Sequence, residues 1–215
     1  MKRMLNNKER YSELNVENLN IVDKDGKVKM TLFNQENIPP LIMDGKDILP
    51  GHRQNDPISG IMFYNGKGEE CGGLIYGSDE DEEGNVYAGA SLTFDQYKQD
   101  QVVQMHFEEE NGQTFYGFSV FDRPDIPISQ IIEKENRIRN SNLSEERKKE
   151  EYNKIYQGNA HRAFMGKDTN GDVSVKLMDS KGRQRIRMVV DKNDIPRIEF
   201  LNDKGEVTYK LPPEE

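Results

Sequence analysis

A turn signal that returns four times in the last quarter of the 215-residue chain constrains its fold more than any other feature. The turns begin at Asp168, Asp179, Asp191 and Asn202, so they recur every 11 or 12 residues, and three of them carry Gly as the fourth residue. Asp or Asn leading into Gly supplies the positive φ that tight hairpin turns need. Because only a short strand fits between successive turns, the spacing predicts an antiparallel β-meander.

Apolar side chains alternate with polar ones between these turns. The apolar positions are Val173, Val175 and Leu177, then Ile186, Met188 and Val190, then Ile198 and Phe200, then Val207, Tyr209 and Leu211. A side-chain period of two residues is typical of a strand with one buried face. The sheet is therefore expected to have one apolar and one polar face.

The same pattern extends through most of the chain before these turns. Leu19 to Phe33 predicts a hairpin, and residues 60–122 predict further strands with Asn/Gly turns between them. Four prolines between residues 34 and 59 predict a long irregular connection, because proline lacks the backbone donor of a sheet. The helical pattern is confined to residues 127–158, with a break near Asn140, and predicts an inserted helical hairpin.

Together these features predict an all-β protein, an antiparallel meander of about a dozen short strands with a helical insertion. Residues 1–18 are expected to form an N-terminal arm, and residues 19–215 a single β-rich domain with the insertion at 127–158. The strand spacing does not distinguish a barrel, a sandwich and a propeller-like arrangement.

The composition bears on how such a sheet is covered and on the partners it attracts. Hydrophobic residues make up 33% of the chain and charged residues 32%, and tryptophan is absent. This is a thin supply for a core, while sheet edges must be closed, covered or charged, so we expect a homo-oligomer. The net charge of −9 disfavours attraction to nucleic acid or to an anionic membrane.

The cellular compartment is expected to be the cytoplasm. Cys71 is the only cysteine, so an intramolecular disulfide is excluded, and its neighbours do not activate it as a nucleophile. The first 20 residues lack the apolar core of a signal peptide, and no run approaches the roughly 20 apolar residues of a membrane span.

A polar connection between two predicted strands is the best candidate for a ligand site. Two carboxylates, a phenol and several glutamines there favour recognition by hydrogen bonds over catalysis. The alternative is a loop whose side chains cap backbone groups. Asp122 and Arg123 at the next strand end are likewise either part of a ligand site or a structural ion pair. The candidate residues are Asp95, Gln96, Tyr97, Asp100, Gln101, Asp122 and Arg123.

Three arginines on one predicted strand face, Arg183, Arg185 and Arg187, are an alternative site for an anion or RNA. Their face lacks the aromatic side chains that stack on single-stranded bases. Carboxylates such as Glu199 on a neighbouring strand favour ion pairs within the sheet instead.

No metal or cofactor is predicted. His52, His106 and His161 lack metal-ligand spacing, and we expect His106 to be solvated on the polar side of its strand. The acidic run of residues 79–83 is typical of a solvated turn. No phosphate loop, dinucleotide fingerprint or nucleophile elbow is present in the sequence.

Four segments, residues 72–76, 92–97, 100–103 and 121–124, carry a resemblance to a known group of proteins. With the hairpins of residues 185–201, they make the chain similar to a group of uncharacterised bacterial β-hairpin-rich proteins that has no assigned function. The resemblance implies a bacterial cytoplasmic protein of one compact type, and it implies no functional residue.

The leading hypothesis is a non-enzymatic β-rich binding or assembly protein that self-associates and takes a small polar ligand or a protein partner. The second is an enzyme that acts on a small polar metabolite through carboxylate acid–base chemistry, with Asp95, Asp122, Arg123 and His106 in one cleft. The third is an anion or RNA binder that uses the arginine face.

Overall fold

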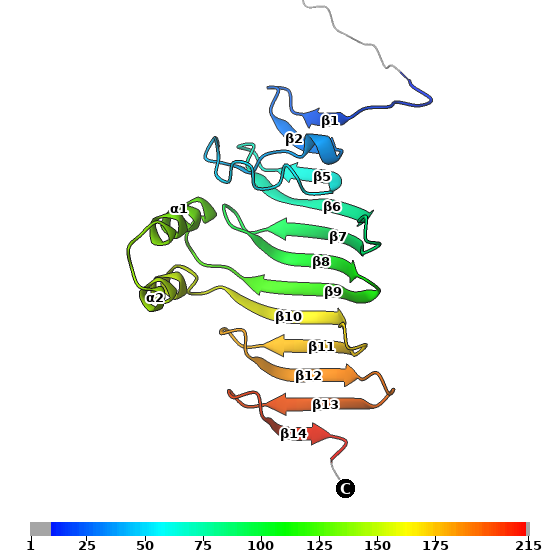
Figure 1. Cartoon of the computed structure of the whole chain (residues 1–215), viewed down its shortest axis with the longest axis vertical. Helices are drawn as coiled ribbons and strands as arrows, with labels where there is room; N and C mark the ends of the chain where they lie inside the picture. Colours follow the sequence, from blue (N-terminus) through cyan, green and yellow to red (C-terminus); the bar gives the residue numbers. More distant parts are fainter. Residues whose placement is uncertain (1–9, 214–215) are drawn as a thin grey trace, which may run out of the picture.

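The computed structural model describes residues 10–213 of the chain. Twelve strands form a single antiparallel sheet, and their order in space is their order in sequence. Figure 1 shows them as a ladder, with β1 at one end and β14 at the other. The strands are β1 (Asn18–Val22), β2 (Val28–Phe33), β5 (Ser59–Tyr64), β6 (Glu70–Glu80), β7 (Val86–Asp95), β8 (Gln101–Glu110), β9 (Gln113–Asp122), β10 (Ala160–Lys167), β11 (Val173–Met178), β12 (Gln184–Val190), β13 (Pro196–Leu201) and β14 (Val207–Leu211).

The predicted meander is confirmed, and its turns form for the predicted reason. In the turn after β10, Gly171 adopts a φ of 91° and its amide donates to the carbonyl oxygen of Asp168. The Asp168 carboxylate also accepts from the amides of Asn170 and Asp172. Asp or Asn at the first position therefore closes each turn, and the residue at its fourth position tolerates the left-handed conformation.

The connection between β2 and β5 contains a 3-10 turn, η1 (Gln35–Asn37), and a separate small hairpin of β3 (Ile42–Met43) and β4 (Lys46–Asp47). Part of this connection lies against the sheet, where Ile38 packs with Phe33 and Met62. These residues form one small core. The predicted arm shows no helix over residues 10–17, and its first nine residues lie outside the described part of the chain.

The predicted helical hairpin consists of α1 (Ile128–Arg139) and α2 (Glu145–Ile155). Ile131 and Ile138 of α1 pack against Ile155 of α2 in a second small core. Figure 1 places both helices beside the strand ends, so they cover neither broad face of the sheet.

The strand register assigns every strand residue to one of two faces. One row of directly paired residues crosses all twelve strands without a polar side chain: Leu19, Leu32, Ile61, Leu74, Leu92, Met105, Phe118, Met165, Val175, Met188, Ile198 and Leu211. A parallel row runs Ile21, Met30, Phe63, Gly72, Phe94, Val103, Val120, Ala163, Leu177, Ile186, Phe200 and Tyr209. We call the surface formed by these two rows the apolar face and the opposite side the polar face.

The twelve strands form one open sheet. Among the described residues they therefore form neither a barrel nor a sandwich nor a propeller-like arrangement, the three possibilities that the sequence left open. No large side chain in residues 10–213 is fully buried. The chain exposes 15341 Å², whereas a compact monomer of its mass exposes about 10,000 Å². The single-layer architecture contributes to this excess, because the apolar face stays open to solvent, whereas the opposite side holds buried residues such as Met62, Phe164 and Glu199.

Candidate functional surface

The apolar face is exposed where a sheet face of its composition is ordinarily buried. At its middle, Met105 is 55% exposed, Met165 58% and Met188 49%. Aromatic side chains of the same face, such as Phe94 and Tyr209, are also more than half exposed. Among the described residues neither helix makes extensive contact with a strand, so no helix covers these side chains.

The exposed apolar area is large for a monomer. The large hydrophobic residues of this face that are more than a third exposed include Ile21, Leu74, Phe94, Met105, Met165, Leu177, Met188, Phe200, Tyr209 and Leu211. With roughly 200 Å² of accessible area for each side chain when free, they present on the order of 1,000 Å² together. The largest apolar patch of a typical monomer is about 300–600 Å², whereas a standard interface buries about 800 Å² on each partner.

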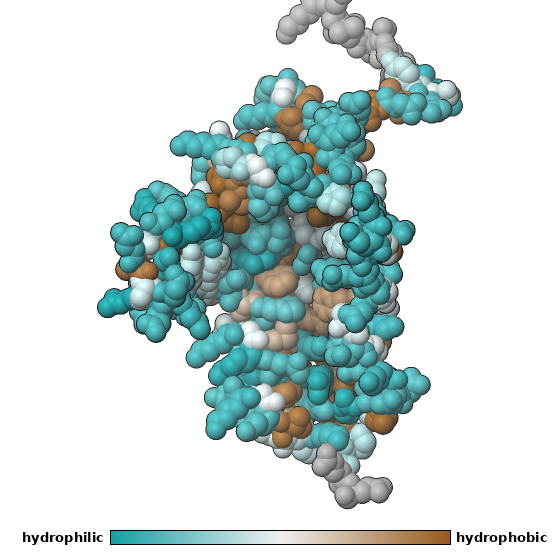
Figure 2. Space-filling view, viewed as in Figure 1, coloured by the Kyte–Doolittle hydropathy of each residue, from teal (hydrophilic) through white to brown (hydrophobic). Residues whose placement is uncertain are grey.

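The polar face differs because many of its charged side chains pair with one another. Lys176, Arg187, Glu199 and Lys210 form one cross-strand row on it. Glu199 is buried and accepts from both Arg187 and Arg197. Figure 2 shows one broad side of the molecule, which is hydrophilic over most of its area.

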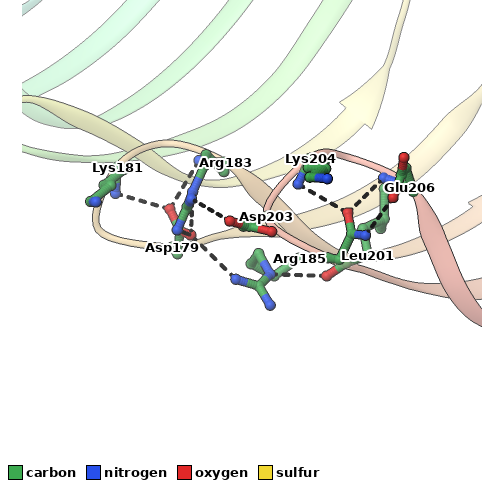
Figure 3. Close-up of polar contacts among 9 residues, drawn as sticks. Asp179, Lys181, Arg183, Arg185, Leu201, Asp203, Lys204 and Glu206 are labelled. Atoms are coloured by element: carbon green, nitrogen blue, oxygen red, sulfur yellow. Dashed lines mark hydrogen bonds and ion pairs between the residues drawn. The ribbon is translucent and has the colours of Figure 1, made fainter.

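The three arginines predicted to bind an anion also have partners within the sheet. Arg183 bonds to Asp179 and lies 3.6 Å from the Asp203 carboxylate, and Arg185 donates to the carbonyl oxygen of Leu201 (Figure 3). Arg187 bonds to Glu199. Since each guanidinium already has a carboxylate or carbonyl partner, this arrangement favours ion pairing within the sheet over capture of an external anion.

The predicted ligand loop after β7 is tied to the exit of β9. Gln99 is 4% exposed, and its amide nitrogen donates to the carbonyl oxygens of Pro124 and Ile126 at 3.2 and 2.8 Å. Gln96 and Tyr97 point outward, and Tyr97 is 63% exposed with Lys67 over its ring. The amide that organises this loop is therefore Gln99, which the sequence did not single out.

Replacing Gln99 by leucine is expected to destabilise the fold by about 2 kcal/mol, because two buried carbonyl oxygens lose their donor. The matched control is Gln96→Leu in the same loop, since Gln96 is exposed. Urea denaturation of both variants measures the difference. Equal stability of the two variants would show that the Gln99 bonds contribute nothing.

The structure separates the other predicted site residues into two groups. Arg123 donates to the carbonyl oxygen of Gln101 at 2.6 Å and lies 3.4 Å from the Asp100 carboxylate. Asp122 bonds instead to Arg162 of β10. Asp100, Gln101 and Arg123 are thus brought together, whereas Asp122 belongs to a different contact.

Asp95, at the end of β7, lies partly buried near other carboxylates. Burial, reinforced by the carboxylates of Glu70 and Asp100, raises the pKa of Asp95 from 3.8 to about 7. Burial likewise raises the pKa of Glu70, although Arg53 pairs with it at 3.0 Å and opposes the shift. One Asp95 oxygen is buried and has no hydrogen-bond partner among the described residues.

This environment predicts that the protein loses stability as the pH rises from about 4 to 7. In that range the folded state keeps a proton on Asp95 that the unfolded chain has released, so ionisation favours unfolding. Asp95→Asn should therefore gain on the order of 2 kcal/mol relative to the wild type between pH 5 and pH 8. Urea denaturation at both pH values tests this, with the exposed turn variant Asp25→Asn as the control, and a pH-independent difference would contradict it.

A cavity of about 330 Å³ lies between the polar face and the connection that precedes β5. Its floor includes Ser91 and Thr93 of β7 and Gln104 of β8, and its other wall includes His52 and Arg53. Of the four residues that the enzyme hypothesis groups together, only His106 lines this cavity.

The expectation that His106 is solvated is wrong. Its side chain is 9% exposed, because Phe115 packs edge-on against the imidazole at 4.9 Å and Phe164 lies beyond it at 6.3 Å. The alternation placed His106 on the polar face correctly, but the Phe164 ring lies close over Gly117 and Gly166 of this face and, with Phe115, encloses the imidazole. Within residues 10–213, no group of three or more potential metal ligands is present.

The exposed methionines of the apolar face were missed as functional candidates. Their alternation in the sequence identifies the face, but the same pattern describes a strand in a two-layer core. Alternation alone therefore does not reveal whether a second layer exists.

The chain matches no protein-family model and no curated protein. Among the described residues, no helix has the length and apolar character needed to span a membrane.

Proposed function

We propose that this protein is a non-enzymatic assembly protein that pairs with a second copy of itself through the apolar face. The observation that supports the proposal is the pair of apolar rows that cross all twelve strands and stay about half exposed at their middle. An exposed apolar area on the order of 1,000 Å² is what a stable dimer needs on each partner.

A second copy fits this surface better than a partner of different character. The two rows contain no charged side chain in the described chain, so two copies meet without charge repulsion and without a charge pattern that selects another protein. The net charge of −9 resides on residues outside these rows, where it keeps the assembled form soluble.

The expected geometry is a sandwich built from two chains. Two twisted sheets pack face to face about 10 Å apart with their strands near −30° to each other, and a two-fold axis brings the same residues of both copies together. The single layer of each chain then becomes one half of a two-layer core.

The enzyme alternative has less support from the geometry. Asp122 is paired with Arg162, and Arg123 with Asp100 and the backbone of Gln101, and neither Asp122 nor Arg123 lines the cavity. The cavity brings His106 within 3.9 Å of the Glu108 carboxylate, but Asp95, Asp122 and Arg123 of the enzyme hypothesis do not line it.

Sedimentation velocity over a concentration series tests self-association. We expect a species of twice 24.9 kDa to predominate at about 10 µM and above. A species of 24.9 kDa at every concentration would overturn the proposal. Masses that grow beyond the dimer would indicate pairing of the open strand edges of β1 and β14 instead, which also contradicts it.

A further inference from the structure

Close contacts hold the surroundings of this half-open cavity on the polar face near the sheet. The connection before β5 touches the sheet at Gly77, where an added Cβ would lie 2.1 Å from the carbonyl oxygen of Pro57. The Tyr87 ring folds over Gly89, where an added Cβ would lie 2.7 Å from its hydroxyl. Both glycines thus allow the walls of the cavity to approach the sheet.

The charged groups of the cavity are already paired or negative. Arg53 bonds to Glu70 at 3.0 Å, and the two side chains are 12% and 13% exposed. The other carboxylates that line the cavity, Asp56 and Glu108, are not matched by a further lysine or arginine in its lining. An anionic ligand therefore meets net negative charge, which disfavours it.

The remaining polar groups of the lining include amide, hydroxyl and imidazole groups that donate and accept hydrogen bonds. Gln104 donates its amide to the Ser91 hydroxyl at 3.0 Å, which leaves the Gln104 carbonyl oxygen as an acceptor. The His106 side chain is nine-tenths buried, and its Nε2 atom has no partner among the described residues. Ile58, Met62 and Ile75 add an apolar wall.

We infer that this cavity binds a small neutral polyhydroxylated molecule of the size of a monosaccharide or a cyclic polyol. Hydroxyl groups match the mixed amide, hydroxyl and imidazole groups, and the C–H face of a sugar ring packs on Tyr87 or the apolar wall. A cavity of about 330 Å³ is at the small end of the range for ligand sites, which suits a single ring. The site lies on the side of the sheet opposite the apolar face, so it does not depend on the assembly proposal.

Saturation-transfer NMR on the full-length protein tests the inference with glucose, galactose, mannose, ribose and myo-inositol as probes and gluconate as an anion of similar size. We expect at least one neutral probe to bind below about 50 mM, and gluconate to bind at least tenfold more weakly. Absence of binding by all neutral probes, or equal binding of gluconate, would overturn the inference.

Two variants locate the binding site. Gln104→Leu and Ser91→Ala should each weaken binding of the neutral probe at least tenfold, because each removes a hydrogen-bonding group from the cavity floor. Gln113→Leu, at an exposed strand end, is the matched control and should bind as the wild type does. Binding that persists in both cavity variants would place the ligand elsewhere and refute the assignment.

Discussion

Replacing Met165 and Met188 together by lysine is expected to convert the proposed dimer into a monomer. The two side chains are 58% and 49% exposed in the single chain, so the substitutions place their charges in water without affecting the monomer fold. In the dimer the same ammonium groups would be buried between apolar rows without partners. We expect the dissociation constant, measured by sedimentation, to rise at least about 1,000-fold, which corresponds to a loss of about 4 kcal/mol.

The matched control replaces Leu143 and Ile195 by lysine. These residues are 42% and 55% exposed, but Leu143 lies between the helices and Ile195 in the turn before β13. The control should remain dimeric. If both double variants dimerise equally well, the apolar face is not the interface, whatever the mass of the wild type.

Gly166→Ala is expected to destabilise the sheet by about 3 kcal/mol, the upper end of the cost of overpacking. Gly166 of β10 pairs directly with Gly117 of β9. A Cβ on Gly166 would lie 2.1 Å from the carbonyl oxygen of Tyr116 and 2.8 Å from the Phe164 ring. Because the nearest atom belongs to the backbone, the strands themselves must shift to admit the methyl group.

Gly66→Ala is the control, since an added Cβ there meets nothing within 4 Å. Urea denaturation of both variants should be measured in the monomeric Met165→Lys/Met188→Lys background, because dimerisation adds its own stabilisation. We expect Gly66→Ala to change the free energy of unfolding by less than about 0.5 kcal/mol. Equal stability of the two glycine variants would show that β9 and β10 separate more easily than the structure indicates.

The sequence predicts the strands, turns and faces of this fold because these depend on local chemistry. Asp168 and Gly171 form their turn within five residues, and the alternation of Ile186, Met188 and Val190 assigns a face to β12 before any partner is known. The helical hairpin was predicted from its period in the same way, and both helices begin and end inside residues 127–158.

Features that depend on contacts between distant residues were not predicted. The bonds from Gln99 to Pro124 and Ile126 join residues more than twenty positions apart, and nothing near Gln99 in the sequence marks it as buried. His106 is enclosed by Phe164, which reaches it only through the pairing of β9 with β10. The number of layers is a property of the whole chain, so an open sheet and a closed one share the same local pattern.

The structure brings some of the predicted ligand-loop residues together. Asp100, Gln101 and Arg123 meet at the strand ends, and Asp95 is partly buried near the carboxylates of Glu70 and Asp100. The cavity itself is formed by the proline-rich connection before β5, whose path is determined by contacts such as that of Pro57 with Gly77. Irregular connections of this kind carry no periodic signal, so their position on a sheet cannot be read from the sequence.

Oxidation of methionine by hydrogen peroxide, followed by mass spectrometry of peptides, tests most directly whether a second copy covers the apolar face. Oxidation follows exposure, so Met105, Met165 and Met188 report on this face, while Met43, which is 3% exposed, should react slowly throughout. We predict that the first three react rapidly in dilute protein and become protected as the concentration rises through the dissociation constant of the dimer. Rapid oxidation of all three at every concentration would contradict the account.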